Sequence, residues 1–145
     1  MSNTNQCTDV CNSLLRGEMS AVETYTQAIE KFDSDPYHAA LIEIRGEHEH
    51  SASVLRQHLI EMGAEPSDSS GVWGSFAEAV EGTAKLLGES AALTALEQGE
   101  EHGINEYENA LEDGEVMDEI KAEIRRTLLP RLTGHVSILR TLKNR

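Results

Sequence analysis

Residues 90–111, SAALTALEQGEEHGINEYENAL, carry the strongest structural signal in this chain. Alanine, leucine and glutamate dominate the stretch, and its large apolar side chains recur three or four residues apart, which is the spacing of one face of an α-helix. Elsewhere strand signals are almost absent, because aromatic residues make up only 4% of the chain and runs of β-branched residues are missing. The sequence therefore predicts an all-α protein.

Three further long helices are predicted from the same spacing. The first extends from about residue 8 to residue 33, and the second from Pro36 to Met62, where Gly63 ends it. The last helix extends from about residue 116 to residue 142. Pro130 lies inside this last helix and should kink it, because proline removes a backbone donor and crowds the preceding turn.

A long connection separates the second predicted helix from the third. Residues 64–74, AEPSDSSGVWG, are rich in turn-forming residues, and Trp73 is expected to anchor this loop to the helices. A short helix is predicted at about residues 75–87. The connection at residues 64–89 is too long for a hairpin, so it should cross the length of the bundle.

The chain thus consists of two helical hairpins, at about residues 8–63 and 90–143, within a single four-helix-bundle domain of residues 1–145. The hairpins look like a repeat, because the first and third helices share the pattern G-E-x6-Y-x2-A-x-E. The matching positions are Gly17, Glu18, Tyr25, Ala28 and Glu30 in the first helix, and Gly99, Glu100, Tyr107, Ala110 and Glu112 in the third.

Charge and hydropathy exclude several classes of protein. The formal net charge of -14 argues against a nucleic-acid partner, which would need clustered lysine and arginine. No apolar run approaches the ~20 residues that cross a bilayer. Residues 1–6 lack the basic start and apolar stretch of a secretory signal, so we expect a cytoplasmic protein. Residues 121–145 are strongly basic, and this last helix should lie against acidic neighbours.

Two glutamates interrupt apolar helix faces and are the first candidate metal ligands. Glu18 falls on the inner face of the first helix, and Glu100 falls at the equivalent point of the third. Glu97, one helical turn before Glu100, can point toward the same place. A carboxylate in a bundle core needs a partner, which a metal ion, Arg131 or shared protons could supply.

Histidines on the second and fourth helices offer imidazole ligands. Glu47 and His50 have the E-x-x-H spacing that lets one helix present a carboxylate and an imidazole to one metal centre. The apolar periodicity of the second helix instead points His48 at the core and leaves His50 on the far side. On the fourth helix, His135 shares the inner face with leucines. We expect at least one of these histidines to lie near Glu18 and Glu100.

These features resemble the ferritin-like superfamily of non-haem di-iron bundles, and the third helix, with Glu97-Gln98-Gly99-Glu100 and Tyr107, resembles an uncharacterised bacterial ferritin-like family, domain of unknown function 2383. The resemblance spans roughly residues 9–143 and implies an antiparallel bundle with one long crossover. It implies the metal ligands Glu18, Glu47, His50, Glu100 and His135. The sixth ligand would fall at Leu132, which is no carboxylate, so the site is incomplete relative to the di-iron pattern.

Two functions from different classes follow. The first is a protein that binds iron, manganese or another divalent metal in the bundle core, for metal handling or defence against oxidative stress. The second is a non-catalytic bundle that serves as an interaction or stress-related scaffold with a degenerate metal site. No nucleotide or organic cofactor is indicated, and a homodimer is expected.

Overall fold

The protein is described by a computed structural model that covers residues 4–32, 37–70 and 88–144. These residues form four helical rods and no strand, so the all-α prediction is confirmed. The rods are α1 (Thr4–Lys31), α2 (Tyr37–Glu61), α4 (Glu89–Glu112) and a last rod of three segments, α5 (Asp118–Glu123), the π-helical segment η2 (Ile124–Leu128) and α6 (Leu129–Lys143). Trp73 and the short helix predicted at 75–87 lie outside the described residues.

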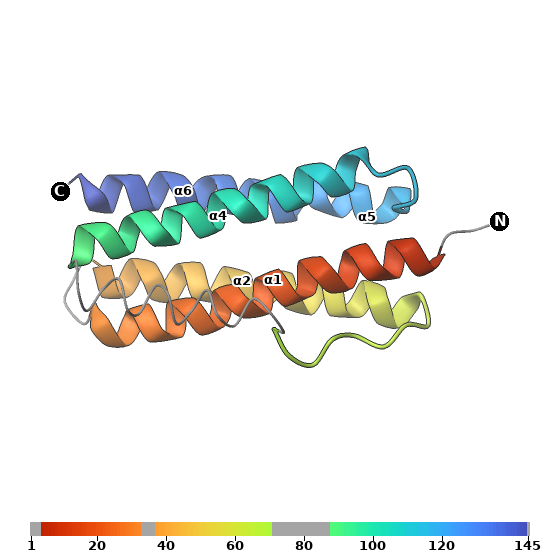
Figure 1. Cartoon of the computed structure of the whole chain (residues 1–145), viewed down its shortest axis with the longest axis horizontal. Coiled ribbons are helices and arrows are strands. Elements are labelled where there is room, and N and C mark those ends of the chain that lie inside the picture. Colours follow the sequence, from red (N-terminus) through yellow and green to blue (C-terminus); the bar gives the residue numbers. More distant parts are fainter. Residues whose placement is uncertain (1–3, 33–36, 71–87, 145) are drawn as a thin grey trace.

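The rods pack side by side as two hairpins (Figure 1). Helix α1 contacts mainly α2, and α4 contacts mainly α6. Helices α2 and α4 run in the same direction, so the chain has to return along the bundle between them, as expected for a long crossover. No described helix is both long enough and apolar enough to traverse a bilayer.

Helix α2 ends in a glycine cap, as its sequence predicts. Gly63 adopts a φ of 75°, a left-handed conformation that costs a residue without a Cβ very little. The backbone N–H of Ala64 donates to the carbonyl of Leu59 at 2.9 Å, and that of Gly63 donates to the carbonyl of Ile60 at 3.0 Å. These two bonds form a Schellman motif and satisfy carbonyls that the helix itself leaves free.

A wide turn precedes Pro130 in the last rod. The backbone N–H of Leu129 donates to the carbonyl of Ile124, five residues earlier, and residues 124–128 are π-helical. Pro130 has no N–H to donate and its ring crowds the preceding turn. The chain accommodates it by widening that turn, and the helix continues as α6.

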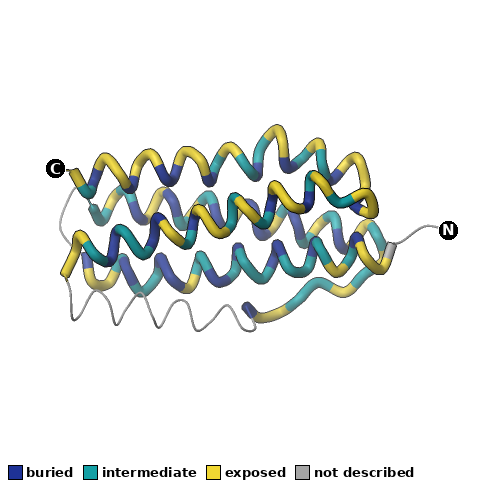
Figure 2. The backbone as a smooth tube through the Cα atoms, turned by 45° about the horizontal axis from the view of Figure 1, so that its top comes forward, coloured by how far each residue is buried: buried dark blue, intermediate teal, exposed yellow. Residues whose placement is uncertain are grey.

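Buried residues recur along the inner side of each rod (Figure 2) and form two apolar clusters. One includes Cys11, Leu55 and Ile124, and the other includes Phe32 and Leu139. The buried polar residues that belong to neither cluster include a group from all four rods, namely Glu18, His48, Glu100 and His135. Since charged side chains are rarely this buried without partners, this group is the candidate site.

Candidate metal centre

Glu18 of α1 and Glu100 of α4 are only 3% and 4% exposed. Each lies one turn or so from apolar residues on the same helix face, so packing that face inward carries the carboxylate inward as well. His48 of α2 joins them, with Nδ1 2.5 Å from Oε1 of Glu18 and Nε2 2.8 Å from Oε2 of Glu100. The two glutamates therefore face each other across one imidazole, and a histidine lies near both of them, as expected from the sequence.

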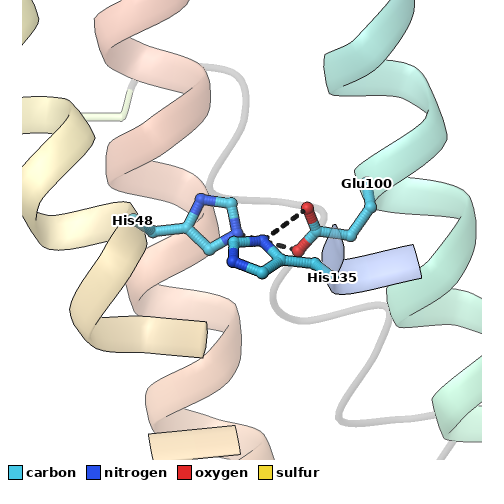
Figure 3. Close-up of side chains that lie close together, drawn as sticks. All are labelled: His48, Glu100 and His135. Carbon is cyan, nitrogen blue, oxygen red and sulfur yellow. Dashed lines mark hydrogen bonds and ion pairs between the residues drawn. The ribbon is translucent and has the colours of Figure 1, made fainter. Parts of the chain in front are cut away.

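His135 of α6 extends this contact chain on the other side of Glu100. Its Nδ1 lies 3.2 Å from Oε1 of Glu100, and its Nε2 lies 2.7 Å from Oε1 of Glu47 on α2. Figure 3 shows His48, Glu100 and His135 converging from three different helices. The full order of contacts is Glu18, His48, Glu100, His135, Glu47, and we call these five residues the Glu–His chain.

Two tyrosines hold the glutamates in a reciprocal arrangement. Tyr25 of α1 donates its hydroxyl to Oε2 of Glu100 on α4 at 2.6 Å. Tyr107 of α4 donates to Oε2 of Glu18 on α1 at 2.5 Å. The repeated G-E-x6-Y pattern thus works across the two hairpins, because each tyrosine contacts the glutamate of the other copy.

The electrostatics of the centre follow from these contacts. Burial alone would lower the pKa of His48, but the carboxylates of Glu100 and Glu18 raise it to about 10. Burial likewise opposes ionisation of Glu100, yet His48 and His135 lower the pKa of its carboxyl to about 2. His48 is therefore a cation between two carboxylates at neutral pH, and it supplies the neutralising charge that the buried glutamates require.

The tyrosine hydroxyls remain donors at neutral pH. Burial and the charge of Glu100 raise the pKa of Tyr25 well above 10.0, and burial and Glu18 do the same for Tyr107. A phenol that keeps its proton donates to a carboxylate and needs no further cation. Both tyrosines are thus hydrogen-bonding residues that hold the buried carboxylates.

The structure brings together Glu18, Glu47, Glu100, His135 and His48 of the predicted site residues, but neither His50 nor Glu97. His50 is exposed, and its Nδ1 lies 2.8 Å from a guanidinium nitrogen of Arg131. The E-x-x-H interpretation required His50 to face the centre. Helix α2 points His48 inward instead, so His50, two residues further along, lies on the opposite side of the helix. The partner of Glu47 is instead His135, on another helix.

Glu97 and Arg131 also have partners elsewhere. Glu97 accepts from Arg140 at 2.8 Å and from Lys143 at 3.1 Å, and these contacts lower the pKa of its carboxyl. They also confirm that the basic last helix lies against an acidic neighbour. Arg131 donates to Ser51 at 2.9 Å besides contacting His50. The neutralising role that the sequence left open to Arg131 therefore falls to histidine.

Three of the residues form a set that fits a single metal ion. One ligand atom from each of His48, Glu100 and His135 lies within 4.8 Å of the other two, and all three side chains are buried. Two imidazoles and one carboxylate are the donor set of mononuclear non-haem iron(II) sites. The position three residues before His135, where the resemblance would place a sixth ligand, is occupied by Leu132, a buried apolar residue that cannot bind a metal ion.

A cavity that the sequence analysis missed reaches this centre from between α1 and α4. Its volume is about 540 Å³, and Glu18, Glu100 and His48 line it together with small residues that include Gly17 and Gly99. Its only sequence signal is the recurrence of small residues near the two glutamates. That pattern equally suits close helix packing, so the cavity could not be inferred from it.

Comparison with known proteins identifies one family. The family model described as "Domain of unknown function (DUF2383)" matches residues 6–113, well over half of the chain. The match ends just after α4, so His135 lies beyond it. No curated protein and no solved structure matches the chain.

Proposed function

The chain belongs to the DUF2383 family, and we propose that it binds one divalent transition-metal ion in the core of its bundle. The proposed ligands are His48, Glu100 and His135. Bound iron would supply redox chemistry with oxygen or peroxide, and manganese or zinc also suits these donors. Metal handling or defence against oxidative stress is the role that we propose for such a site.

The observation that carries this proposal is that each of the two imidazoles contacts a second carboxylate besides Glu100. His48 turns Nε2 toward Glu100 and Nδ1 toward Glu18, while His135 turns Nδ1 toward Glu100 and Nε2 toward Glu47. Histidines that bind metals almost always give their second ring N–H to such a partner, which fixes the tautomer and the ring orientation. Glu18 and Glu47 are therefore assigned to orient the ligands.

Access to the ligands from solvent favours an exchangeable ion. A second hollow, of about 440 Å³, lies beside α2 and α6 and is lined by Glu47 and His135. The side chain of Glu47 is 44% exposed, whereas that of His135 is 2% exposed. Arg126 and Arg131 also line this hollow, so Glu47 is the carboxylate there that could attract a cation toward the buried His135.

The second candidate function is a scaffold without metal, and one observation favours it. The five residues of the Glu–His chain, with the two tyrosines, already satisfy one another. A buried ionic network that is fully paired can persist without any ligand, although an apolar core of similar shape is often as stable or more so. In that case the network would make the pairing of the helices specific.

Metal analysis of the protein, purified without a chelator or affinity tag, tests the two functions against each other. We expect close to one transition-metal ion per chain, and calorimetric titration of the stripped protein should show one site. His48→Ala and His135→Ala should lose this ion, whereas the exposed His50→Ala should keep it. If the stripped protein takes up no iron, manganese or zinc, the scaffold function replaces the metal site.

A further inference from the structure

We propose that the cavity between α1 and α4 binds an elongated apolar molecule whose head group donates hydrogen bonds, an alcohol or a primary amine, with that head against Glu18. This binding goes beyond the proposed metal site: two of the metal ligands, His48 and Glu100, also line the cavity, but Glu18 is not a ligand and its contact with a head group requires no metal ion.

The size of the cavity calls for an organic molecule. Its volume of about 540 Å³ lies within the roughly 300–1,000 Å³ of small-molecule sites in proteins. A water molecule takes only about 30 Å³ in the liquid, so a diatomic gas or peroxide would leave most of the space unfilled. The cavity is therefore much larger than access of a small oxidant to the centre would require.

The described walls are apolar or small and suit an alkyl chain. Leu14 and Ala21 of α1 face the cavity, as do Leu96 of α4 and Leu132 of α6. At Gly17, a side chain would meet nothing within 4 Å, which shows that this part of α1 borders open space. Apolar walls with a few polar groups at one place are the usual make-up of a site that holds a ligand in one orientation.

The inner end of the cavity selects the head group. From the described part of the chain, Glu18 accepts one bond at each oxygen, from His48 and from Tyr107, and a carboxylate can accept about four in all. It therefore has capacity for a donor from a ligand. The described lining residues include three carboxylates, Glu18, Glu100 and Glu106, and no lysine or arginine, and the one cation among them, His48, is already paired with Glu18 and Glu100. A carboxylate head would be repelled, and an ester could not donate.

Calorimetric titration of the metal-free protein with decanol, decylamine, decanoate and methyl decanoate tests the proposal. All four probes carry similar alkyl chains, so they differ mainly in the head group. Decanol and decylamine should bind saturably at one site, and at least about tenfold more tightly than decanoate and methyl decanoate. Equal binding of decanoate, or no saturable binding of any probe, would overturn the proposal.

One variant locates the binding, and a second serves as its control. Gly17→Leu fills the cavity and should weaken binding of decanol at least about tenfold. Gly46→Leu on α2 is the matched control, because a side chain there also meets nothing within 4 Å but does not line the cavity, and it should bind like the wild type. Equal effects of both variants would place the binding elsewhere and refute the assignment.

Glu18→Gln tests the head group separately from the cavity. The amide keeps the shape of the side chain but both donates and accepts, so the preference for decanol over methyl decanoate should shrink severalfold. An unchanged preference would contradict the role of Glu18. Failure of metal uptake would leave all these results intact, because the titrations use metal-free protein.

Discussion

Replacing His48 by leucine in the metal-free protein should cost a large part of its stability. The substitution removes the cation that lies 2.5 Å from Glu18 and 2.8 Å from Glu100 and leaves two buried carboxylates without it. Burial opposes the charge of His48, yet the two glutamates raise its pKa from 6.5 to about 10. The interaction with His48 and His135 lowers the pKa of Glu100 from 4.5 to about 2, although burial opposes this shift as well. Both shifts describe largely the same interaction, seen from its two sides.

One pKa unit corresponds to about 1.4 kcal/mol, so each shift indicates an interaction of about 3–5 kcal/mol. Loss of one partner from a buried ion pair costs about the same amount. The total stability of a domain is about 5–15 kcal/mol, so the variant should fold but be much less stable.

Urea unfolding followed by circular dichroism, between pH 4.5 and 6.5, measures the effect. We expect a lower midpoint with an unchanged slope, since the same surface becomes exposed on unfolding. His50→Leu, two residues along the same helix and exposed, should change the stability by no more than about 0.5 kcal/mol. A loss below about 1 kcal/mol for His48→Leu would refute the idea that His48 neutralises the glutamates.

Three further predictions concern the same centre and the helices around it. Stability of the metal-free protein should be greatest between pH 4.5 and 6.5, which urea unfolding at several pH values would check. The raised pKa of His48 contributes stability that is lost as the pH rises toward 10. The lowered pKa of Glu100 contributes stability that is lost as the pH falls toward 2. Tyr107→Phe should cost about 1.5–3 kcal/mol, because a buried carboxylate loses a hydrogen bond, and an unchanged urea midpoint would contradict this. Gly46→Ala should stabilise the protein by about 0.5–1 kcal/mol, because alanine has a higher helix propensity than glycine. Gly103→Ala should stabilise it less, since the new Cβ would lie 2.9 Å from a side-chain carbon of Leu132 on α6. Equal melting temperatures of the two variants would argue against that contact.

The sequence alone determined the helices and part of the centre. Helical spacing and terminal signals lie within single segments, so the end of α2 at Gly63 could be predicted from local rules. The inward direction of Glu18, Glu100 and His48 followed in the same way, because a residue on an apolar face is buried together with that face.

The tertiary structure alone decided which of these residues meet. Glu47 pairs with His135 from another helix, although its spacing suggested His50, and Tyr25 and Tyr107 each cross to the other hairpin. Such contacts depend on the rotation and axial shift of whole helices against one another, which no local pattern encodes. The cavity beside Glu18 arises for the same reason, since its volume is set by how far two separate hairpins approach each other.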